Sequence, residues 1–289
     1  MSNTIELAKS FVPKLDECYR LASLTSVLDG APELAKQGAN ANELIIPMMS
    51  MDGLADYSRN GGYVQGGVTM TNETVKCNFD RGRRFDVDVM DDLETAGLAF
   101  GRLSAQFIRD KVVPELDAFR FASYCSISGV TKKEETLADG AATVAALSAA
   151  VTAMDDEEVT ATGRYLFITP TLLQGINDMD TTKSKKVLEG FEQVIKVPQR
   201  RFYTAIKQLS GKTGEEAGGY TKAAGAANIN FAIVQKDALI QYTKHAAPKI
   251  IAPENNPDAD AYVFGYRMVG IAKAYKNMLS GMYFSHDKA

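Results

Sequence analysis

Only two side chains in this sequence could act as imidazole bases or imidazole metal ligands, His245 and His286. Neither lies in an H-E-x-x-H pattern or near a pair of cysteines, the spacings that zinc sites use. We expect His286 to be solvated, and we expect His245 at the end of a helix, where a cation would complement the helix dipole. A Ser-His-Asp site would have to use His245, and the G-x-S-x-G elbow that presents such a serine is absent.

One stretch resembles part of a phosphate-binding loop. Gly211-Lys212-Thr213 matches the end of a P-loop, but Ile206 occupies the position of the first glycine of that motif. Without that glycine the loop cannot wrap a phosphate. No G-x-G-x-x-G dinucleotide motif occurs either. The sequence therefore predicts no nucleotide site.

Acidic clusters are the remaining candidates, because carboxylates bind hard divalent cations. Asp86 and Asp88 are explained by the solvent side of a strand, and Asp91 and Asp92 by the cap of a helix. Asp258-Ala259-Asp260 lacks the residues that follow in a calcium loop. We therefore predict no catalytic, cofactor-binding or metal-binding residue, no cofactor, and a protein that is not an enzyme.

Composition limits the class of partner. The 289 residues are 45% hydrophobic and 24% charged, with a net charge of -4, so we expect a soluble globular protein without strong attraction to nucleic acid or anionic membranes. No apolar run reaches bilayer length, and the sequence MSNTIELAKS lacks a secretory signal. We expect a cytosolic location or an assembly formed there, with Cys18, Cys77 and Cys125 as reduced, buried or half-buried thiols.

The element with the strongest periodic signal runs from Arg83 to Tyr124. Apolar residues at 85, 87 and 89 alternate with charged ones, which predicts a strand with one buried face. Asp91, followed three residues later by Glu94, then predicts the start of a long amphipathic helix. Pro114 removes a backbone donor, so we expect a kink or a restart of the helix there.

A β-rich stretch precedes this helix, from Glu43 to Met90. Pro47 predicts a free strand edge, and the glycine-rich sequence RNGGYVQGG predicts a mobile turn at the tip. A long ribbon is marginal alone, so it either folds back on its own domain or lies on another copy of the chain. The pattern leaves both open. We interpret the basic run 81–84 and the nearby aspartates as a contact between subunits.

The rest of the chain predicts a mixed α+β protein. The pattern after Ser126 indicates α/β structure and the pattern after Ile250 returns to β. Expected helices cover residues 141–154, a segment beginning at Pro170 after a Thr169 cap, 202–209 and 237–244. Expected strands cover residues 165–168, 194–197, 229–234, 262–275 and 282–284.

This order of elements resembles the major capsid proteins of tailed phages, in particular those of siphophages and prophages of Gram-positive hosts. The stretches that carry the resemblance are residues 52–121, 163–176 and 229–279. The resemblance implies the HK97-like capsid fold. It divides the chain into an N-terminal arm and connector (1–42), an extended β-hairpin loop (43–90), a spine helix with the first part of a peripheral domain (91–126), an axial α/β domain (127–248) and the second part of the peripheral domain (249–289).

The resemblance also implies a function. Copies of the chain would form pentamers and hexamers of an icosahedral shell that encloses double-stranded DNA without sequence-specific binding, assembled in the host bacterial cytoplasm and found in the virion. Scaffolding, portal and decoration proteins would be further partners, and no membrane would be involved. Residues 43–75 contain no lysine, so we expect a non-covalent shell. The alternatives are an encapsulin-type shell around a cargo enzyme and a soluble α/β enzyme.

Overall fold

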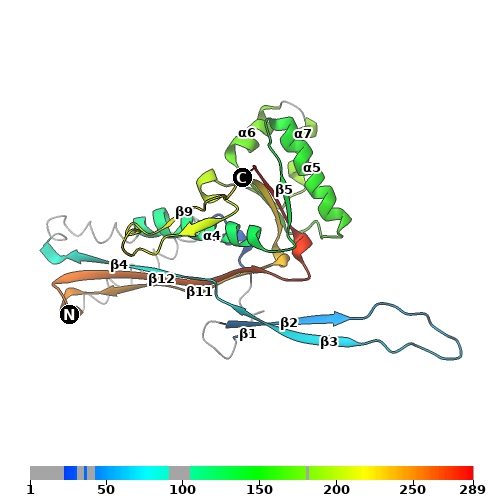
Figure 1. The fold of residues 1–289 in the computed structure, drawn as a ribbon, viewed down its shortest axis with the longest axis horizontal. Coiled ribbons are helices and arrows are strands. Elements are labelled where there is room, and N and C mark those ends of the chain that lie inside the picture. Colours follow the sequence, from blue (N-terminus) through cyan, green and yellow to red (C-terminus); the bar gives the residue numbers. More distant parts are fainter. Residues whose placement is uncertain (1–22, 31–35, 38–42, 91–104, 180–181, 289) are drawn as a thin grey trace.

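The computed structural model describes residues 23–30, 36–37, 43–90, 105–179 and 182–288. Figure 1 shows helices packed on a mixed sheet at one side, a long antiparallel sheet, and a narrow ribbon that extends away from both. Helices and sheets are mixed within one chain, which confirms the α+β class.

A five-stranded sheet forms the centre of the first part, with the strand order β5-β13-β10-β6-β7. Every residue of β10 is buried, as its continuous apolar sequence predicts. Phe231 and Ile233 face the helix α5, while Ala232 and Val234 face α4. The strands are β5 (Thr131–Glu134), β6 (Arg164–Ile168), β7 (Gln193–Lys196), β10 (Ile229–Gln235) and β13 (Met282–His286).

Helices cover both faces of this sheet. The predicted helix over 141–154 is α5, which begins after Asp139, whose carboxylate accepts the N–H of Ala142 at 2.7 Å. The predicted Thr169-Pro170 start is also confirmed, although the Thr169 side chain makes no cap hydrogen bond. No helix among the described residues is long and apolar enough to cross a membrane. The helices are α4 (Val113–Ser126), α5 (Gly140–Asp156), α6 (Pro170–Asp178) and α7 (Thr182–Glu189).

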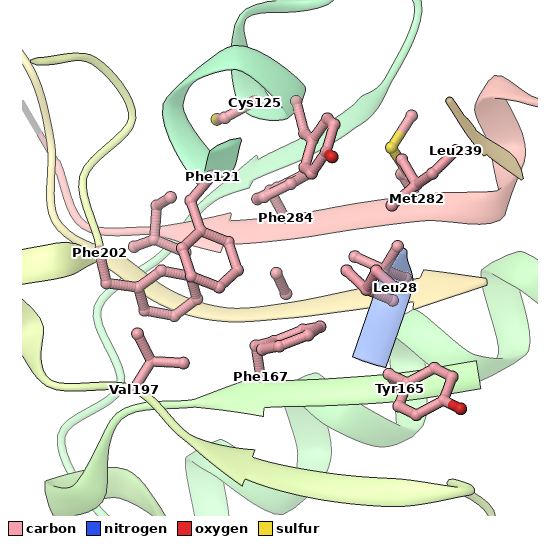
Figure 2. Packing of buried hydrophobic residues seen from close by; sticks show 14 of the residues in the cluster. Leu28, Phe121, Cys125, Tyr165, Phe167, Val197, Phe202, Leu239, Met282 and Phe284 are labelled. Carbon is pink, nitrogen blue, oxygen red and sulfur yellow. The ribbon is translucent and has the colours of Figure 1, made fainter. Parts of the chain in front are cut away.

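Figure 2 shows the cluster between α4 and the sheet. The ring of Phe121 packs edge-on against Phe167, with ring centroids 5.1 Å apart, and against Phe202, 4.7 Å away. Leu28 enters the same cluster from a 3-10 turn, η1 (Ser26–Leu28), and is 1% exposed. Apolar burial of this kind is the main source of folding free energy, so this cluster is the stable centre of the molecule.

The second part is a long antiparallel sheet in the order β11-β12-β4. The half-buried Phe85 and Val87 alternate with exposed charged residues, as predicted. Gly82 is needed because a Cβ there would lie 2.8 Å from the carbonyl oxygen of Tyr266 on β12. The start of α4 packs on this sheet through Val113 and Leu116, together with Ile108 in the turn before it. The strands are β4 (Phe79–Asp88), β11 (Leu239–Ile251) and β12 (Ala261–Ala274).

The predicted ribbon from 43 to 90 is shorter than expected. Only β2 (Glu43–Met51) and β3 (Val68–Lys76) pair as a ribbon, with the short β1 (Lys36–Gln37) on the outer edge of β2. β4 turns away and pairs with β12 over ten residues. The reason is that the apolar face of β4 is buried in the core beneath α4. In a free two-stranded ribbon that face would stay in contact with water. The five-part division of the chain stays a prediction.

The spine helix differs from its prediction at the start. Val89 and Met90 are already helical, and the carboxylate of Asp88 accepts the N–H of Met90 at 2.9 Å, so the cap lies three residues before Asp91. Residues 91–104 lie outside the described part. The predicted interruption at Pro114 is confirmed, because a π-helical turn, η3 (Ile108–Val112), directly precedes α4.

Two predicted helices are wrong. Residues 202–209 contain a short strand, β8 (Ile206–Gln208), which pairs with β9 (Tyr220–Lys222) as a hairpin. Residues 237–244 form the start of β11 after a 3-10 turn. Both segments satisfy their backbone groups by pairing with distant strands, and tertiary pairing outweighs local helix propensity. The remaining short turns are η4 (Gln199–Arg201), η5 (Lys236–Ala238), η6 (Pro253–Asn255) and η7 (Leu279–Gly281).

A buried carboxylate fixes the first described residues to the helix. Asp117 on α4 is 0% exposed and accepts hydrogen bonds from the Ser23 and Thr25 hydroxyls and from the N–H groups of Leu24 and Thr25, at 2.7 to 3.3 Å. The Nη1 atom of Arg201 forms an ion pair with the Oδ2 atom of Asp117 at 3.2 Å. A buried carboxylate is tolerated only when its oxygens are this well satisfied. Residues 23–25, α4 and η4 are thereby held together.

Candidate assembly surface

The ribbon β2–β3 and its tip form a long solvent-exposed segment of the described residues. Figure 1 shows it extending past the end of the folded part, in pale blue and cyan, with a long tip beyond the strands. Residues 49–61 and 63–72 are all exposed. Its exposed large hydrophobic side chains are Met49, Met51, Leu54, Tyr57, Tyr63, Val64, Val68 and Met70.

The tip keeps an ordered shape through local bonds. Asp52 and Gly67 close its neck, with the N–H of Asp52 donating to the Gly67 carbonyl at 3.1 Å and the Asp52 carboxylate accepting the Gly67 N–H at 2.7 Å. Ser58 and Gly62 form a two-bond turn, and Gly62 has a φ of 74°, which glycine adopts without strain. The predicted glycine turn is therefore confirmed. The tip keeps its form without burying its apolar groups.

The base of the ribbon is anchored to the long sheet. Val75 is 3% exposed and packs with Ile240 and Ile271, and Lys276 pairs with Glu73 at 2.8 Å. The predicted free edge at Pro47 is present in the described residues, because β1 pairs only with positions 44 and 45 of β2. The ribbon is thus fixed at one end, and beyond the β1 pairing the described residues give its outer part no packing partner. Among the described residues it does not fold back on its own chain.

The basic run that we interpreted as a subunit contact has partners within the chain. Arg81 donates to Glu115 at 2.8 Å and to the carbonyls of Leu209 and Gly219. Arg84 pairs with Asp86 two residues away. Arg81 and Arg84 thus have partners within the described chain, and the contact between subunits stays a prediction. Burial raises the pKa of Glu115, and Arg81 only partly offsets it.

A groove of about 940 Å³ lies beside Arg81. It is bounded by β4, the π-helical turn and the β8–β9 hairpin, and apolar rings of Phe107 and Tyr266 contribute to its lining. Arg83, Arg200 and Lys222 are exposed at the same groove. Asp80, Asp110 and Glu115 also line it, so the groove combines apolar surface with charges of both signs. The sequence analysis missed it, because it depends on the wrongly predicted segment 202–209.

The residues that the sequence analysis considered for catalysis or ligand binding lie in different parts of the structure. His245 lies at a bulge in β11, not at a helix end, and the half-buried His286 ends β13. Gly211-Lys212-Thr213 belongs to the β8–β9 turn region. Among the described residues no group of three His, Cys, Asp or Glu side chains could hold a metal ion.

The described cysteines are free thiols, as predicted. Cys125 is buried, and burial raises the pKa of its thiol to about 11. Cys77 is half-buried, and desolvation also raises the pKa of its thiol. Both are therefore poor nucleophiles at neutral pH. Cys18 lies outside the described residues.

The similarity to known proteins lies in the structure of the chain and not in its sequence. No family model and no curated protein matches the sequence. The structure is similar to a virus-like particle from Pyrococcus furiosus (10% identity, TM-score 0.59, 96% of this chain and 98% of that chain). It is also similar to a chain of Gordonia phage Cozz (10%, 0.59, 93% and 87%) and to the capsid of cyanophage P-SCSP1u (12%, 0.54, 88% and 86%).

This chain has the HK97-like fold. The similarity extends over 88 to 96% of this chain and 86 to 98% of the compared chains. It confirms the fold that the sequence resemblance implied. At 10 to 12% identity few side chains are shared with these proteins. The contacts that this chain makes therefore depend on its own residues.

Proposed function

We propose that this protein is the major capsid protein of a tailed bacteriophage, which assembles with copies of itself into an icosahedral shell around double-stranded DNA. The observation that carries the proposal is the ribbon. It is ordered at its neck and base, yet it exposes Leu54 fully and Tyr63 to 90%. In a monomer these apolar groups stay in contact with water. In a shell, a neighbouring copy could bury them and so stabilise the ribbon.

The role is structural in this proposal. Mild net acidity, -4 over the whole chain, suits a container that does not clamp its genome, because tight phosphate binding requires a surplus of cations. Pentamers and hexamers of the shell, and a scaffolding protein, a portal and decoration proteins as further partners, belong to the same proposal. So do its location in the virion and its assembly in the host bacterial cytoplasm.

Expression of the full chain followed by size-exclusion chromatography and negative-stain electron microscopy tests the proposal. Closed shells or rings of five or six subunits support it. A monomer at every concentration and salt condition would overturn it. The lack of lysine in residues 43–75 adds a second expectation: dissociated shells should run as single chains on denaturing gels, without cross-linked ladders.

Deletion of residues 58–67 tests the role of the ribbon tip. These residues contribute no buried hydrophobic side chain, so the shortened subunit should stay folded and soluble with an unchanged circular dichroism spectrum. It should fail to form closed shells. Normal particles from this variant would show that the tip has no part in assembly.

A shell that holds a cargo protein is the second candidate, favoured by the similarity to the virus-like particle from Pyrococcus furiosus. The two candidates differ in content. Nuclease-treated particles purified from the native host should contain protected double-stranded DNA if the phage proposal holds. A stoichiometric second protein without DNA, identified by mass spectrometry, would support the cargo shell.

A further inference from the structure

Methionines gather on the exposed ribbon. The chain has 11 methionines, and the end of β2 contributes Met48, Met49 and Met51. Met70 on β3 is paired directly with Met49, and Val68 is paired with Met51. Directly opposed residues of an antiparallel pair lie on the same face, as do residues two apart along one strand. Met49, Met51 and Met70, which we name the ribbon methionines, are therefore neighbours on one face.

The ribbon methionines are open to solvent. Met49 is 58% exposed, Met51 65% and Met70 64%, and none of them belongs to a hydrophobic cluster of the described residues. Met48 is half-buried and lies on the opposite face, so it is not one of the group. A small soluble reagent can therefore reach the ribbon methionines in the free subunit.

The methionines of the core have the opposite environment. Met154 on α5, Met268 on β12 and Met282 on β13 are 0 to 2% exposed. Each of them packs in a hydrophobic cluster. A reagent in solution reaches such side chains only when the structure opens. The chain therefore carries an internal control for any reaction of the exposed thioethers.

The described thiols offer little competition for an oxidant. Peroxides react with the thiolate form of cysteine and not with the protonated thiol. Desolvation raises the pKa of the Cys77 thiol, and burial raises the pKa of the Cys125 thiol to about 11. Both are therefore protonated at neutral pH. A thioether has no proton to lose, so the exposed methionines are the accessible sulfur nucleophiles among the described residues.

The reaction at each methionine is a two-electron oxidation of sulfur. A sulfur lone pair attacks one oxygen of hydrogen peroxide, an S–O bond forms, and the O–O bond breaks. The released hydroxide takes the proton from the transferred oxygen and becomes water, so sulfur is oxidised and the peroxide is reduced. The product is methionine sulfoxide, which is polar and which methionine sulfoxide reductases convert back to methionine. Oxidation thus makes apolar side chains of the ribbon polar in a reversible way.

We propose that Met49, Met51 and Met70 form a modification site, at which peroxides oxidise the free subunit to methionine sulfoxide and thereby prevent its assembly. The inference rests on the proposed function, in which a neighbouring copy buries apolar groups of the ribbon. Burial of a sulfoxide oxygen without a hydrogen-bond donor is unfavourable, so the oxidised ribbon is disfavoured in a shell. Burial in the shell in turn shields the same sulfur atoms from the oxidant.

Peptide mapping by mass spectrometry tests where the oxidant acts. Subunits dissociated from shells are treated with dilute hydrogen peroxide, and the oxidation of each methionine is followed over time. The ribbon methionines should react more than about tenfold faster than Met154, Met268 and Met282, and about tenfold more slowly in intact shells than in free subunits. Ribbon methionines that react as slowly as the buried ones would overturn the site. Equal rates in shells and in subunits would overturn its link to assembly.

Assembly of the oxidised subunits tests the consequence. After removal of the peroxide, oxidised wild-type subunits should give about tenfold fewer particles than untreated ones, measured by size-exclusion chromatography and electron microscopy. The triple variant Met49→Leu, Met51→Leu and Met70→Leu keeps apolar side chains without sulfur, so the same treatment should leave its yield within about twofold. Equal losses in the variant and the wild type would show that these three residues are not responsible.

Met90 provides the matched control, because it is 64% exposed, like Met70, but lies outside β2 and β3. Met90→Leu should lose assembly after peroxide treatment as the wild type does. Protection by this substitution would place the sensitive sulfur outside the ribbon and overturn the assignment. Methionine sulfoxide reductases of both stereospecificities should restore the yield of oxidised wild-type subunits. A loss that persists after complete reduction would contradict a reversible block at methionine.

Failure of this inference and failure of the proposed function give different results. Oxidised subunits that assemble normally, beside normal shells from untreated wild-type subunits, would refute the modification site and leave the proposed function intact. A wild-type chain that never assembles would instead overturn the proposed function.

Discussion

The central sheet and the ribbon are built from similar strand-forming residues but have opposite surroundings. Every residue of β10 is buried, whereas Val68 to Thr71 on β3 are all exposed. The central sheet has helices on both faces, whereas no helix of the described residues shares a hydrophobic cluster with the ribbon. The difference indicates that burial stabilises the central sheet within one chain, whereas under the proposed function the ribbon would be stabilised by contacts between copies.

The largest effect is expected where α4 meets the central sheet. Phe121→Ala removes a fully buried ring that contacts Phe167 and Phe202. It should lower the free energy of unfolding by about 3–5 kcal/mol, the usual range for such a truncation. Urea denaturation followed by circular dichroism measures this. A loss below about 1 kcal/mol would show that this cluster does not hold the two layers together.

A somewhat smaller loss is expected at the buried carboxylate. Asp117→Ala leaves Arg201 and the donors of residues 23–25 without their acceptor, which should cost about 3 kcal/mol. Asp110→Ala on the π-helical turn is the matched control, because that carboxylate is exposed. Denaturation of the two variants side by side separates burial from loss of charge. Equal stability would contradict the role assigned to Asp117.

A local, pH-dependent effect is expected in the β8–β9 hairpin. The pKa of Glu215 is lowered to about 2 by the side chain of Lys207 and by the Ser210 backbone. Because the folded pKa lies below the ordinary value, its contribution is complete above pH 4.5 and is lost as the pH falls toward 2. Lys207→Met should raise the pKa of Glu215, measured by NMR titration of its carboxyl group. An unchanged pKa would show that the Lys207 contact is absent in solution.

The smallest effect on the folded subunit is expected in the ribbon. Leu54→Ser and Tyr63→Ser replace fully solvated groups, so the free energy of unfolding should change by less than about 0.5 kcal/mol. The same variants should reduce shell formation, since these groups are proposed to be buried only between copies. The two measurements together sharpen the contrast with Phe121. A ribbon variant that destabilises the subunit as much as Phe121→Ala would remove that contrast.

The sequence predicted elements whose signals are local. The apolar run of β10, the alanine-rich α5 and the Pro114 interruption were all predicted from spacing and chemistry. Prediction from the sequence failed for segments that form a strand by pairing with a distant strand. β8 and the start of β11 have helix-compatible sequences, but β9 and β12 pair with them. The groove was missed for the same reason, and the Asp117 network was missed because its donors lie more than ninety positions earlier.

The sequence by itself determined an α+β subunit with a glycine-tipped ribbon and no pattern of catalytic residues, because hydrophobic period, turn residues and motif spacing act over a few neighbouring positions. Only the tertiary structure decided that β4 leaves the ribbon for the core and that Arg81 pairs within the chain. It also decided that the exposed apolar side chains of the ribbon belong to no hydrophobic cluster of the described residues. These features depend on pairing between segments far apart in sequence, and a pattern read along the chain does not record which distant partner completes a surface.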